Sequence, residues 1–279
     1  MSDGVHRMDD LNRLHSIESG EGPPLLLIHG LFDLLETWER LIPLLSDRFK
    51  ITAIDLPGFG KSRLPEEWEE SLSGMIEAVV AFLDSKGIEK TSIVGSSMGG
   101  SIALGVAGRH PERVDKIVLI NPYGFPSPPV AAEVARSRIL GALLPYLLNK
   151  PVLKRCARTL FSRSLNDPRL LTDALIERVI APFATLRRRR DLFRFLQGIS
   201  TETMREIDAL LPRIHQPVLI LWGENDRWLT IDHAHRLRQR LPNNRLITLP
   251  DCGHLPQVDK PKEVAEAIRP FLFNDRSPL

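Results

Sequence analysis

Short, almost entirely apolar runs alternate along the chain with segments in which apolar residues recur at helical spacing. Runs rich in Val, Ile and Leu predict buried strands, and the segments between them predict amphipathic helices. The predicted strands are residues 25–30, 49–56, 91–95, 116–120, 218–222 and 245–249. The predicted helices are residues 36–45, 73–83, 98–108, 232–241 and 262–273. Because such an alternation is typical of a parallel sheet covered on both faces, the pattern predicts an α/β fold with a mostly parallel central sheet.

The alternation stops between Asn121 and about Leu211. Several prolines come first, and the helical stretches 134–148 and 169–184 follow without a strand signal. We therefore predict a core formed by residues 1–121 and 212–279 and a helical insertion at 122–211. Right-handed crossovers place the carboxyl ends of parallel strands along one edge of the sheet, where open α/β sheets bind ligands. The insertion is expected to lie over that edge.

Composition and charge remove several classes of protein. The 279 residues include 37 basic and 35 acidic side chains, a net charge of +2, so the charge balance does not require nucleic acid as a partner. Cys156 and Cys252 are the only cysteines, which is too few for a disulfide framework and consistent with a reducing cytosol. The N-terminus lacks the apolar core of a secretory signal, and no apolar run approaches the ~18 residues of a membrane span. We expect a cytoplasmic protein with no membrane span.

The sequence Gly95-Ser96-Ser97-Met98-Gly99 joins a predicted strand to a predicted helix. A turn this sharp gives its central residue a positive φ and excludes side chains two positions to either side. Ser97 has glycine at both of those positions and Ser96 does not, which makes Ser97 the candidate nucleophile. The alternative interpretation is a glycine-rich turn with incidental serines.

A serine hydroxyl needs a base, and the base needs a carboxylate that orients it. His254 follows the last predicted strand and Asp226 follows the strand before it, so both are expected at the same edge as Ser97. The chain order Ser, Asp, His is one in which such triads occur. Glu224 is the neighbouring alternative acid. The competing interpretations are that His254 caps the next helix and that Asp226 pairs with Arg227 at the surface.

The sequence His29-Gly30-Leu31-Phe32 ends the first predicted strand. The backbone N–H of Leu31, or of Phe32 as the second choice, is expected to join that of Met98 in stabilising an oxyanion. His29 is expected to be a structural hydrogen-bonding residue rather than a second base. No metal and no organic cofactor is implied by these residues.

Four motifs in this order resemble the α/β-hydrolase superfamily, in particular its small-molecule branch with a helical cap. They are His29-Gly30 with Trp38 downstream, Asp55-Leu56-Pro57-Gly58-Phe59-Gly60-Lys61-Ser62, the turn around Ser97, and Gly223-Glu224-Asn225-Asp226 with Gly253-His254. The resemblance runs from about residue 20 to the C-terminus and implies that the insertion is a cap that roofs the pocket. Many relatives carry His where this chain has Ser96. Relatives that open epoxides or displace halide carry Asp at the position of Ser97.

These features predict a serine hydrolase that cleaves small-molecule carboxylic esters through an acyl-enzyme intermediate, with a preference for apolar acyl groups. Trp228, Leu143 and Leu147 are the candidate substrate-binding residues. The cap leucines either line an acyl pocket or pack the cap onto the core. The alternatives on the same triad are hydrolysis of a C–C bond beside a carbonyl, of a thioester or of an amide, and non-catalytic binding of a small molecule. Arg187–Arg190 is either a solvated helical face or a site of weak attraction to anionic lipid or carboxylated substrate.

Overall fold

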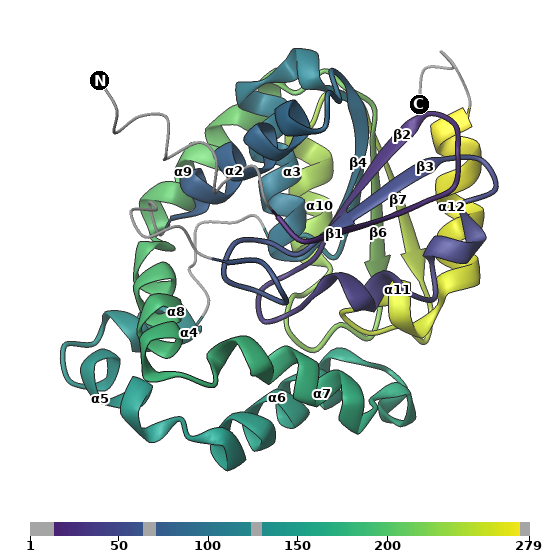
Figure 1. Cartoon of the computed structure of the whole chain (residues 1–279). Helices are drawn as coiled ribbons and strands as arrows, with labels where there is room; N and C mark the ends of the chain where they lie inside the picture. Colours follow the sequence, from purple (N-terminus) through teal and green to yellow (C-terminus); the bar gives the residue numbers. More distant parts are fainter. Residues whose placement is uncertain (1–13, 64–70, 124–129, 274–279) are drawn as a thin grey trace.

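The computed structural model describes residues 14–63, 71–123 and 130–273 and contains a seven-stranded sheet (Figure 1). The strand order is β1-β3-β2-β4-β5-β6-β7, with β1 antiparallel to β3 and all other neighbours parallel. The strands are β1 (Ser16–Ser19), β2 (Pro24–Ile28), β3 (Lys50–Ile54), β4 (Thr91–Ser96), β5 (Val114–Ile120), β6 (Val218–Gly223) and β7 (Asn244–Leu249). The predicted α/β fold with a mostly parallel sheet is confirmed.

Apolar layers cover both faces of this sheet. Helices α2 (Leu72–Ser85), α3 (Met98–Arg109) and α10 (Asp232–Arg240) bury their apolar stripes in the core on one face. The other face is covered by α12 (Pro261–Phe273) and by the segment around Trp38. The residues of the inner strands β2 to β6 are almost all buried, whereas those of the edge strands β1 and β7 are mostly accessible to solvent. A sheet buried on both sides explains why its strands are continuous apolar runs in the sequence.

Six helices lie between β5 and β6, and most of them form a layer below the carboxyl edge of the sheet (Figure 1). They are α4 (Val130–Arg136), α5 (Leu140–Leu147), α6 (Lys150–Ser164), α7 (Asp173–Ile180), α8 (Leu186–Gly198) and α9 (Thr201–Leu210). The helical insertion therefore exists in the described part of the chain. The boundary between the insertion and the core at residue 211 stays a prediction. Helix α9, the last helix of the insertion, packs closely on α3 of the core: a Cβ on Gly108 would lie 2.8 Å from Cβ of Leu210.

Several predicted elements differ in detail from the structure. The predicted helix 36–45 consists of two short 3₁₀ turns, Leu35–Trp38 and Ile42–Leu44, because Pro43 lacks the N–H that a continuous helix would use. Helix α2 begins at Leu72, one residue before its predicted start, and is capped by Ser71, whose Oγ accepts from Gly74 N at 3.0 Å. The predicted helix 134–148 is divided into α4 and α5. Strand β1 was not predicted because its four residues have no continuous apolar pattern.

No helix in the described ranges is both long enough and apolar enough to cross a membrane. Within the same ranges, no group of three or more His, Cys, Asp or Glu side chains is arranged to hold a metal ion.

Candidate active site

Ser97 occupies the turn between β4 and α3 in a conformation that few residues adopt. Its φ and ψ are 51° and −118°, and its N–H donates to the carbonyl oxygen of Ile120 at 2.9 Å. A Cβ on Gly95 would lie 2.3 Å from Gly99 O, and a Cβ on Gly99 would lie 2.2 Å from Ile28 O. Both glycines are therefore required by the close approach of backbone atoms. The turn holds Ser97 at the carboxyl edge of the sheet and at the N-terminus of α3, where the helix dipole favours negative charge.

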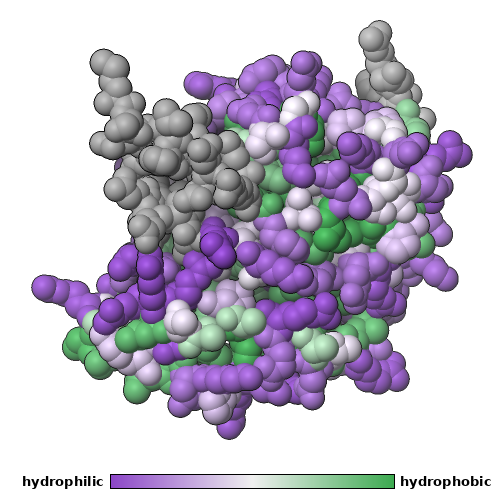
Figure 2. All heavy atoms as spheres, in the orientation of Figure 1, coloured by the Kyte–Doolittle hydropathy of each residue, from purple (hydrophilic) through white to green (hydrophobic). Residues whose placement is uncertain are grey.

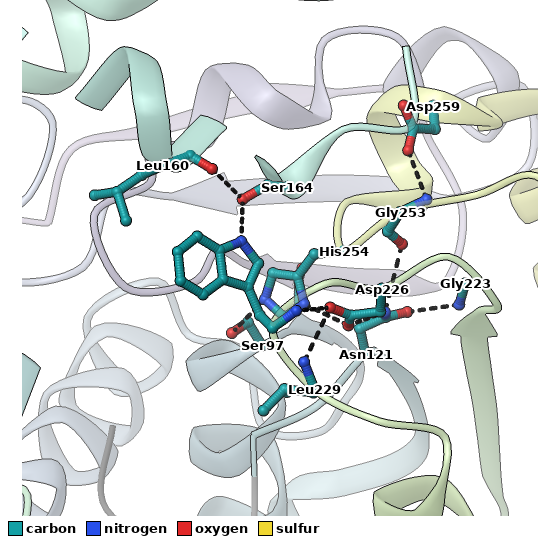
Figure 3. Close-up of polar contacts among 12 residues, drawn as sticks. Ser97, Asn121, Leu160, Ser164, Gly223, Asp226, Leu229, Gly253, His254 and Asp259 are labelled. Atoms are coloured by element: carbon teal, nitrogen blue, oxygen red, sulfur yellow. Dashed lines mark hydrogen bonds and ion pairs between the residues drawn. The ribbon is translucent and has the colours of Figure 1, made fainter. Parts of the chain in front are cut away.

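The structure brings Ser97, His254 and Asp226 together in a chain of hydrogen bonds (Figure 3). His254 Nε2 lies 3.0 Å from Ser97 Oγ, and His254 Nδ1 lies 2.6 Å from Asp226 Oδ2. The side chains of Asp226 and His254 are 1% and 11% exposed. With the ring proton on Nδ1 and donated to the carboxylate, Nε2 is free to accept the proton of the serine hydroxyl. This geometry is what a nucleophile, a base and an orienting acid require.

Four donors surround the Asp226 carboxylate. Oδ1 accepts from the backbone N–H groups of Trp228 and Leu229 at 2.7 and 3.0 Å, and Oδ2 accepts from His254 and from Asn121 Nδ2. Burial alone would raise the pKa of Asp226. The bonds from His254, Asn121 and Trp228 outweigh it and hold that pKa below its ordinary value. The acid beside His254 is therefore kept ionised.

Asn121 was missed as a site residue by sequence reasoning. Its Nδ2 donates to Asp226, its Oδ1 accepts from Gly223 N at 2.9 Å, and its backbone has a φ of 41°. Asn121 thus fixes the carboxylate and the end of β6 at the same time. The signal was present in the sequence, because a polar residue directly follows the buried strand β5 at the edge where Ser97 was expected.

The insertion holds the His254 loop in place through a second set of contacts that the sequence did not predict (Figure 3). His254 N donates to the carbonyl oxygen of Ser164, the last residue of α6, at 2.7 Å. The carboxylate of Asp259 accepts from Gly253 N at 2.8 Å and from Asn166 N at 2.9 Å. Asp259 therefore ties the residue before His254 to the end of α6. No spacing rule places residues 164 and 166 next to residue 253.

The other motif residues support the edge of the sheet. His29 Nδ1 donates to Gly30 O at 2.8 Å and its Nε2 accepts from Leu56 N at 2.9 Å, so both ring nitrogens serve the backbone. The Asp55 carboxylate accepts from the N–H of Leu35 and of Lys61, each at 2.9 Å. Ser96, which stands where many relatives have His, is buried and its Oγ accepts from Gln257 Nε2 at 3.2 Å.

Leu31, Phe32 and Met98 all line the same cavity as Ser97. Among the described residues, no acceptor takes the backbone N–H of any of the three. Phe32 has a φ of 57°, so the chain turns sharply where the donor groups are needed. The arrangement is suited to an oxyanion hole, and the choice between Leu31 and Phe32 as the partner of Met98 stays a prediction.

A cavity of about 280 Å³ lies between the sheet edge and the insertion, with Ser97 and His254 in its wall. Most of its lining is apolar and comes from both sides, including Leu31, Phe32, Leu72, Met98, Leu160, Phe161, Ile199, Met204, Trp228, Leu229 and Leu255. Within the described residues, the lining includes no lysine and no arginine. The space next to Ser97 is therefore suited to an uncharged, apolar group.

Two of the three candidate substrate-binding residues do not reach this cavity. Trp228 lines it, and its Nε1 donates to Ser164 Oγ at 2.9 Å. Leu143 and Leu147 are 53% and 62% exposed and are absent from the lining, because the small residues Gly141 and Pro145 form the buried side of α5. The structure gives no support to substrate binding by these two leucines, and that role stays a prediction. Of the other cap leucines, Leu144 and Leu148 are partly buried and pack against the apolar cluster that spans the core and the insertion.

The acid Asp33 also lines the cavity. Asp33 is 5% exposed, and its carboxylate accepts from Leu34 N at 2.9 Å and from Thr37 Oγ1 at 3.2 Å. Burial raises the pKa of Asp33 from 3.8 to about 7, because the hydrogen bonds from Leu34, Thr37 and Gly30 offset only part of the desolvation of the charged form. Cys252, next to the His254 loop, is buried, and burial raises the pKa of its thiol to about 12. Cys252 is therefore a neutral packing residue.

The chain belongs to the α/β-hydrolase fold family, whose model matches residues 23–261. It is 27% identical over 272 residues to a 2-hydroxy-6-oxo-6-phenylhexa-2,4-dienoate hydrolase of Burkholderia cepacia, covering 94% of this chain and 92% of that protein. It is also 27% identical over 277 residues to a cis-3-alkyl-4-alkyloxetan-2-one decarboxylase of Shewanella oneidensis, and the match covers 94% of this chain and 85% of that protein. The solved structure of an α/β-hydrolase fold protein from Burkholderia ambifaria is similar to this structure, with a TM-score of 0.82 and 26% sequence identity. The match covers 92% of this chain and 94% of that chain.

Proposed function

We propose that this protein hydrolyses esters of uncharged, apolar carboxylic acids, with Ser97, His254 and Asp226 as its catalytic triad. The observation that carries the proposal is the hydrogen-bonded chain from Asp226 through His254 to Ser97 at the wall of an apolar cavity. Residues 122–211 act in this proposal as the cap over the cavity. The partner is a small-molecule ester.

The steps follow from the positions of the groups. Ser97 Oγ attacks the ester carbonyl as His254 Nε2 takes its proton, and Asp226 stabilises the imidazolium that forms. The N–H of Met98, with that of Leu31 or Phe32, binds the oxyanion, and each such donor is worth ~3–4 kcal/mol in the transition state. His254 then returns the proton to the leaving alcohol. One water, activated by the same histidine, releases the acid and restores Ser97.

Hydrolysis of a C–C bond is the second candidate, because the Burkholderia cepacia relative is named as a dienoate hydrolase. A dienoate carries a carboxylate, and a carboxylate buried beside Ser97 would need a cationic partner. The lining contributed by the described residues offers none, and it includes the acid Asp33. This difference favours a neutral ester over a dienoate as substrate.

A substrate panel separates the two candidates. Nitrophenyl esters with acyl chains from acetate to decanoate, a 2-hydroxy-6-oxo-dienoate and a β-lactone are offered to the wild type and to the Ser97→Ala variant. The proposal predicts that kcat/KM for the esters exceeds that for the dienoate by at least about 100-fold and is lost in Ser97→Ala. A preference for the dienoate would establish the C–C hydrolase instead. Ester turnover that persists in Ser97→Ala would refute the triad.

A further inference from the structure

Exposed apolar side chains are concentrated on one helix of the insertion. Six of the nine large hydrophobic residues that are exposed in the described chain lie between residues 139 and 152. Five of them form a surface that we call the α5 face: Ile139, Leu140, Leu143, Tyr146 and Leu147, which are 46–70% exposed. Their spacing of three and four residues puts them on one side of the helix. Figure 2 shows hydrophobic atoms at the lower left of the molecule, where α5 lies in Figure 1.

The opposite side of α5 explains why these residues face outward. A Cβ on Gly141 would lie 2.0 Å from the carbonyl oxygen of Ala135 in α4, and Arg189 Nε of α8 donates to the carbonyl oxygen of Pro145 at 2.7 Å. Helix α5 is therefore seated on α4 and α8 by its small, buried residues. Leu144 and Leu148 are also partly buried against the apolar cluster, whereas the large side chains of the α5 face lie on the other side of the helix and remain exposed.

Basic residues are concentrated in the part of the chain that contains α5. Residues 134–166 contain seven basic side chains and no acidic one. Residues 130–200 contain 14 basic and 5 acidic side chains, a net charge of +9, whereas the rest of the chain has 23 basic and 30 acidic side chains and a net charge of −7. The positive charge of the protein is thus concentrated in the insertion, to which the α5 face belongs.

The arginine run of α8 divides into two pairs. Arg188 and Arg189 are partly buried and donate to backbone carbonyl oxygens, of Ser62 in one case and of Pro145, Phe183 and Ala184 in the other. Arg187 and Arg190 are exposed on the other side of the helix. The Arg190 guanidinium lies 5.0 Å from the centre of the Tyr146 ring and donates to its hydroxyl, so a cation borders the α5 face directly.

We propose that the α5 face is a docking surface for a membrane that contains anionic phospholipid. Exposed leucine, isoleucine and tyrosine side chains bordered by arginine match the interfacial region of a bilayer, where apolar groups enter the acyl boundary and cations meet the phosphates. A second copy of the chain fits poorly, because two such faces brought together would place like charges opposite each other. The proposal concerns a surface away from Ser97 and is independent of the ester hydrolase activity.

Vesicle co-sedimentation tests this inference on the full chain. The vesicles contain phosphatidylcholine alone or with about 30% phosphatidylglycerol, and binding is measured at about 50 and 500 mM NaCl. The wild type is expected to bind the anionic vesicles at least tenfold more tightly, and more weakly at high salt. Leu143→Ser with Leu147→Ser is expected to lower binding at least tenfold, and Arg187→Glu about fivefold or more. Ile17→Ser, which changes an exposed apolar residue on β1, is the matched control and is expected to bind like the wild type.

Three results would overturn the proposal. One is absence of wild-type binding to anionic vesicles, and another is equal binding by the wild type and the double leucine variant. The third is a concentration-dependent dimer that the leucine substitutions dissolve, without vesicle binding, which would assign the surface to a second copy. Thermal melting of each variant checks its fold. Should the leucine variant unfold, Arg187→Glu and the vesicle-induced protection of residues 139–152 from hydrogen exchange in the wild type decide the matter.

Discussion

Asp259 is expected to set the position of His254 although it touches neither Ser97 nor Asp226. Its carboxylate holds the backbone N–H of Gly253 at 2.8 Å and that of Asn166 at 2.9 Å, and His254 follows Gly253 directly. His254 N in turn donates to Ser164 O at 2.7 Å. Asp259→Ala removes the group that joins the His254 loop to the end of α6. The loop would then sample arrangements in which Nε2 no longer faces Ser97.

The size of the effect follows from the bonds that are lost. A hydrogen bond to a charged acceptor contributes about 1.5–3 kcal/mol, and Gly253 is buried, so water replaces its lost bond poorly. Because each 1.4 kcal/mol corresponds to a factor of ten, a loss confined to the Gly253 bond lowers the equilibrium constant between the aligned and misaligned loop by about 10- to 100-fold. We therefore expect kcat of Asp259→Ala to fall by up to that factor. KM is expected to change little, because Asp259 does not line the cavity.

The assay compares steady-state kinetics on one nitrophenyl ester for three variants. Asp259→Asn keeps an acceptor oxygen for Gly253 and is expected to lie between Asp259→Ala and the wild type. Asp251→Asn is the matched control, since Asp251 is an exposed acid in the same loop and asparagine tolerates its φ of 49°. A kcat for Asp259→Ala within twofold of the wild type, in a protein with an unchanged melting temperature, would refute the positioning role. An equal fall in kcat for Asp251→Asn would show that the effect comes from the lost negative charge in this loop and not from the hydrogen bonds of Asp259.

Three further substitutions test the site and its support. Gly99→Ala would place a Cβ 2.2 Å from Ile28 O and is expected to destabilise the fold by more than about 3 kcal/mol. Its control, Gly87→Ala, has open space around the new Cβ and should cost only ~1–2 kcal/mol, because of the positive φ of Gly87. Equal melting temperatures of the two variants would contradict this. Asn121→Gly keeps the positive φ but removes the donor to Asp226, and kcat should fall about tenfold at unchanged KM, which steady-state kinetics would check. Asp33→Asn should stabilise the protein relative to the wild type above pH 7, by ~4 kcal/mol at most, and the difference should shrink as the pH falls and become small below about pH 3.5. The sign follows because the pKa of Asp33 is raised in the folded protein. Protonated Asp33 therefore contributes its full share to the free energy of unfolding below its unfolded pKa, and that share is lost as the pH rises through about 7. A difference in melting temperature between variant and wild type that does not vary with pH would contradict this.

The core of the fold could be predicted because a parallel sheet buried on both faces leaves a strong pattern in the sequence. Six of the seven strands were recognised as continuous apolar runs, and the glycines around Ser97 located the turn that the structure requires. Strand β1 was not predicted, because a short edge strand buries little of its surface and does not need a continuous apolar run. The exposed face of α5 was misjudged because apolar residues at helical spacing predict a buried stripe. In this helix Gly141 and Pro145 occupy the buried side instead.

The site divides in the same way. Ser97, Asp226 and His254 could be nominated because each follows a predicted strand at one edge of the sheet. Their supporting contacts could not, because the bonds of Asp259 to Gly253 and Asn166 join segments up to 93 residues apart along the chain. Such contacts depend on how the insertion is seated on the core, and local sequence patterns do not encode that seating.

Covalent labelling of Ser97 is the most direct test of its proposed role as a nucleophile activated by His254. The wild type is treated with a fluorophosphonate, which reacts with activated serines, and the modified residue is identified by peptide mass spectrometry. A single adduct on Ser97 is expected, which forms rapidly at neutral pH in the wild type and far more slowly in His254→Ala. An unlabelled Ser97 in folded wild-type protein, or labelling at the same rate without His254, would contradict it.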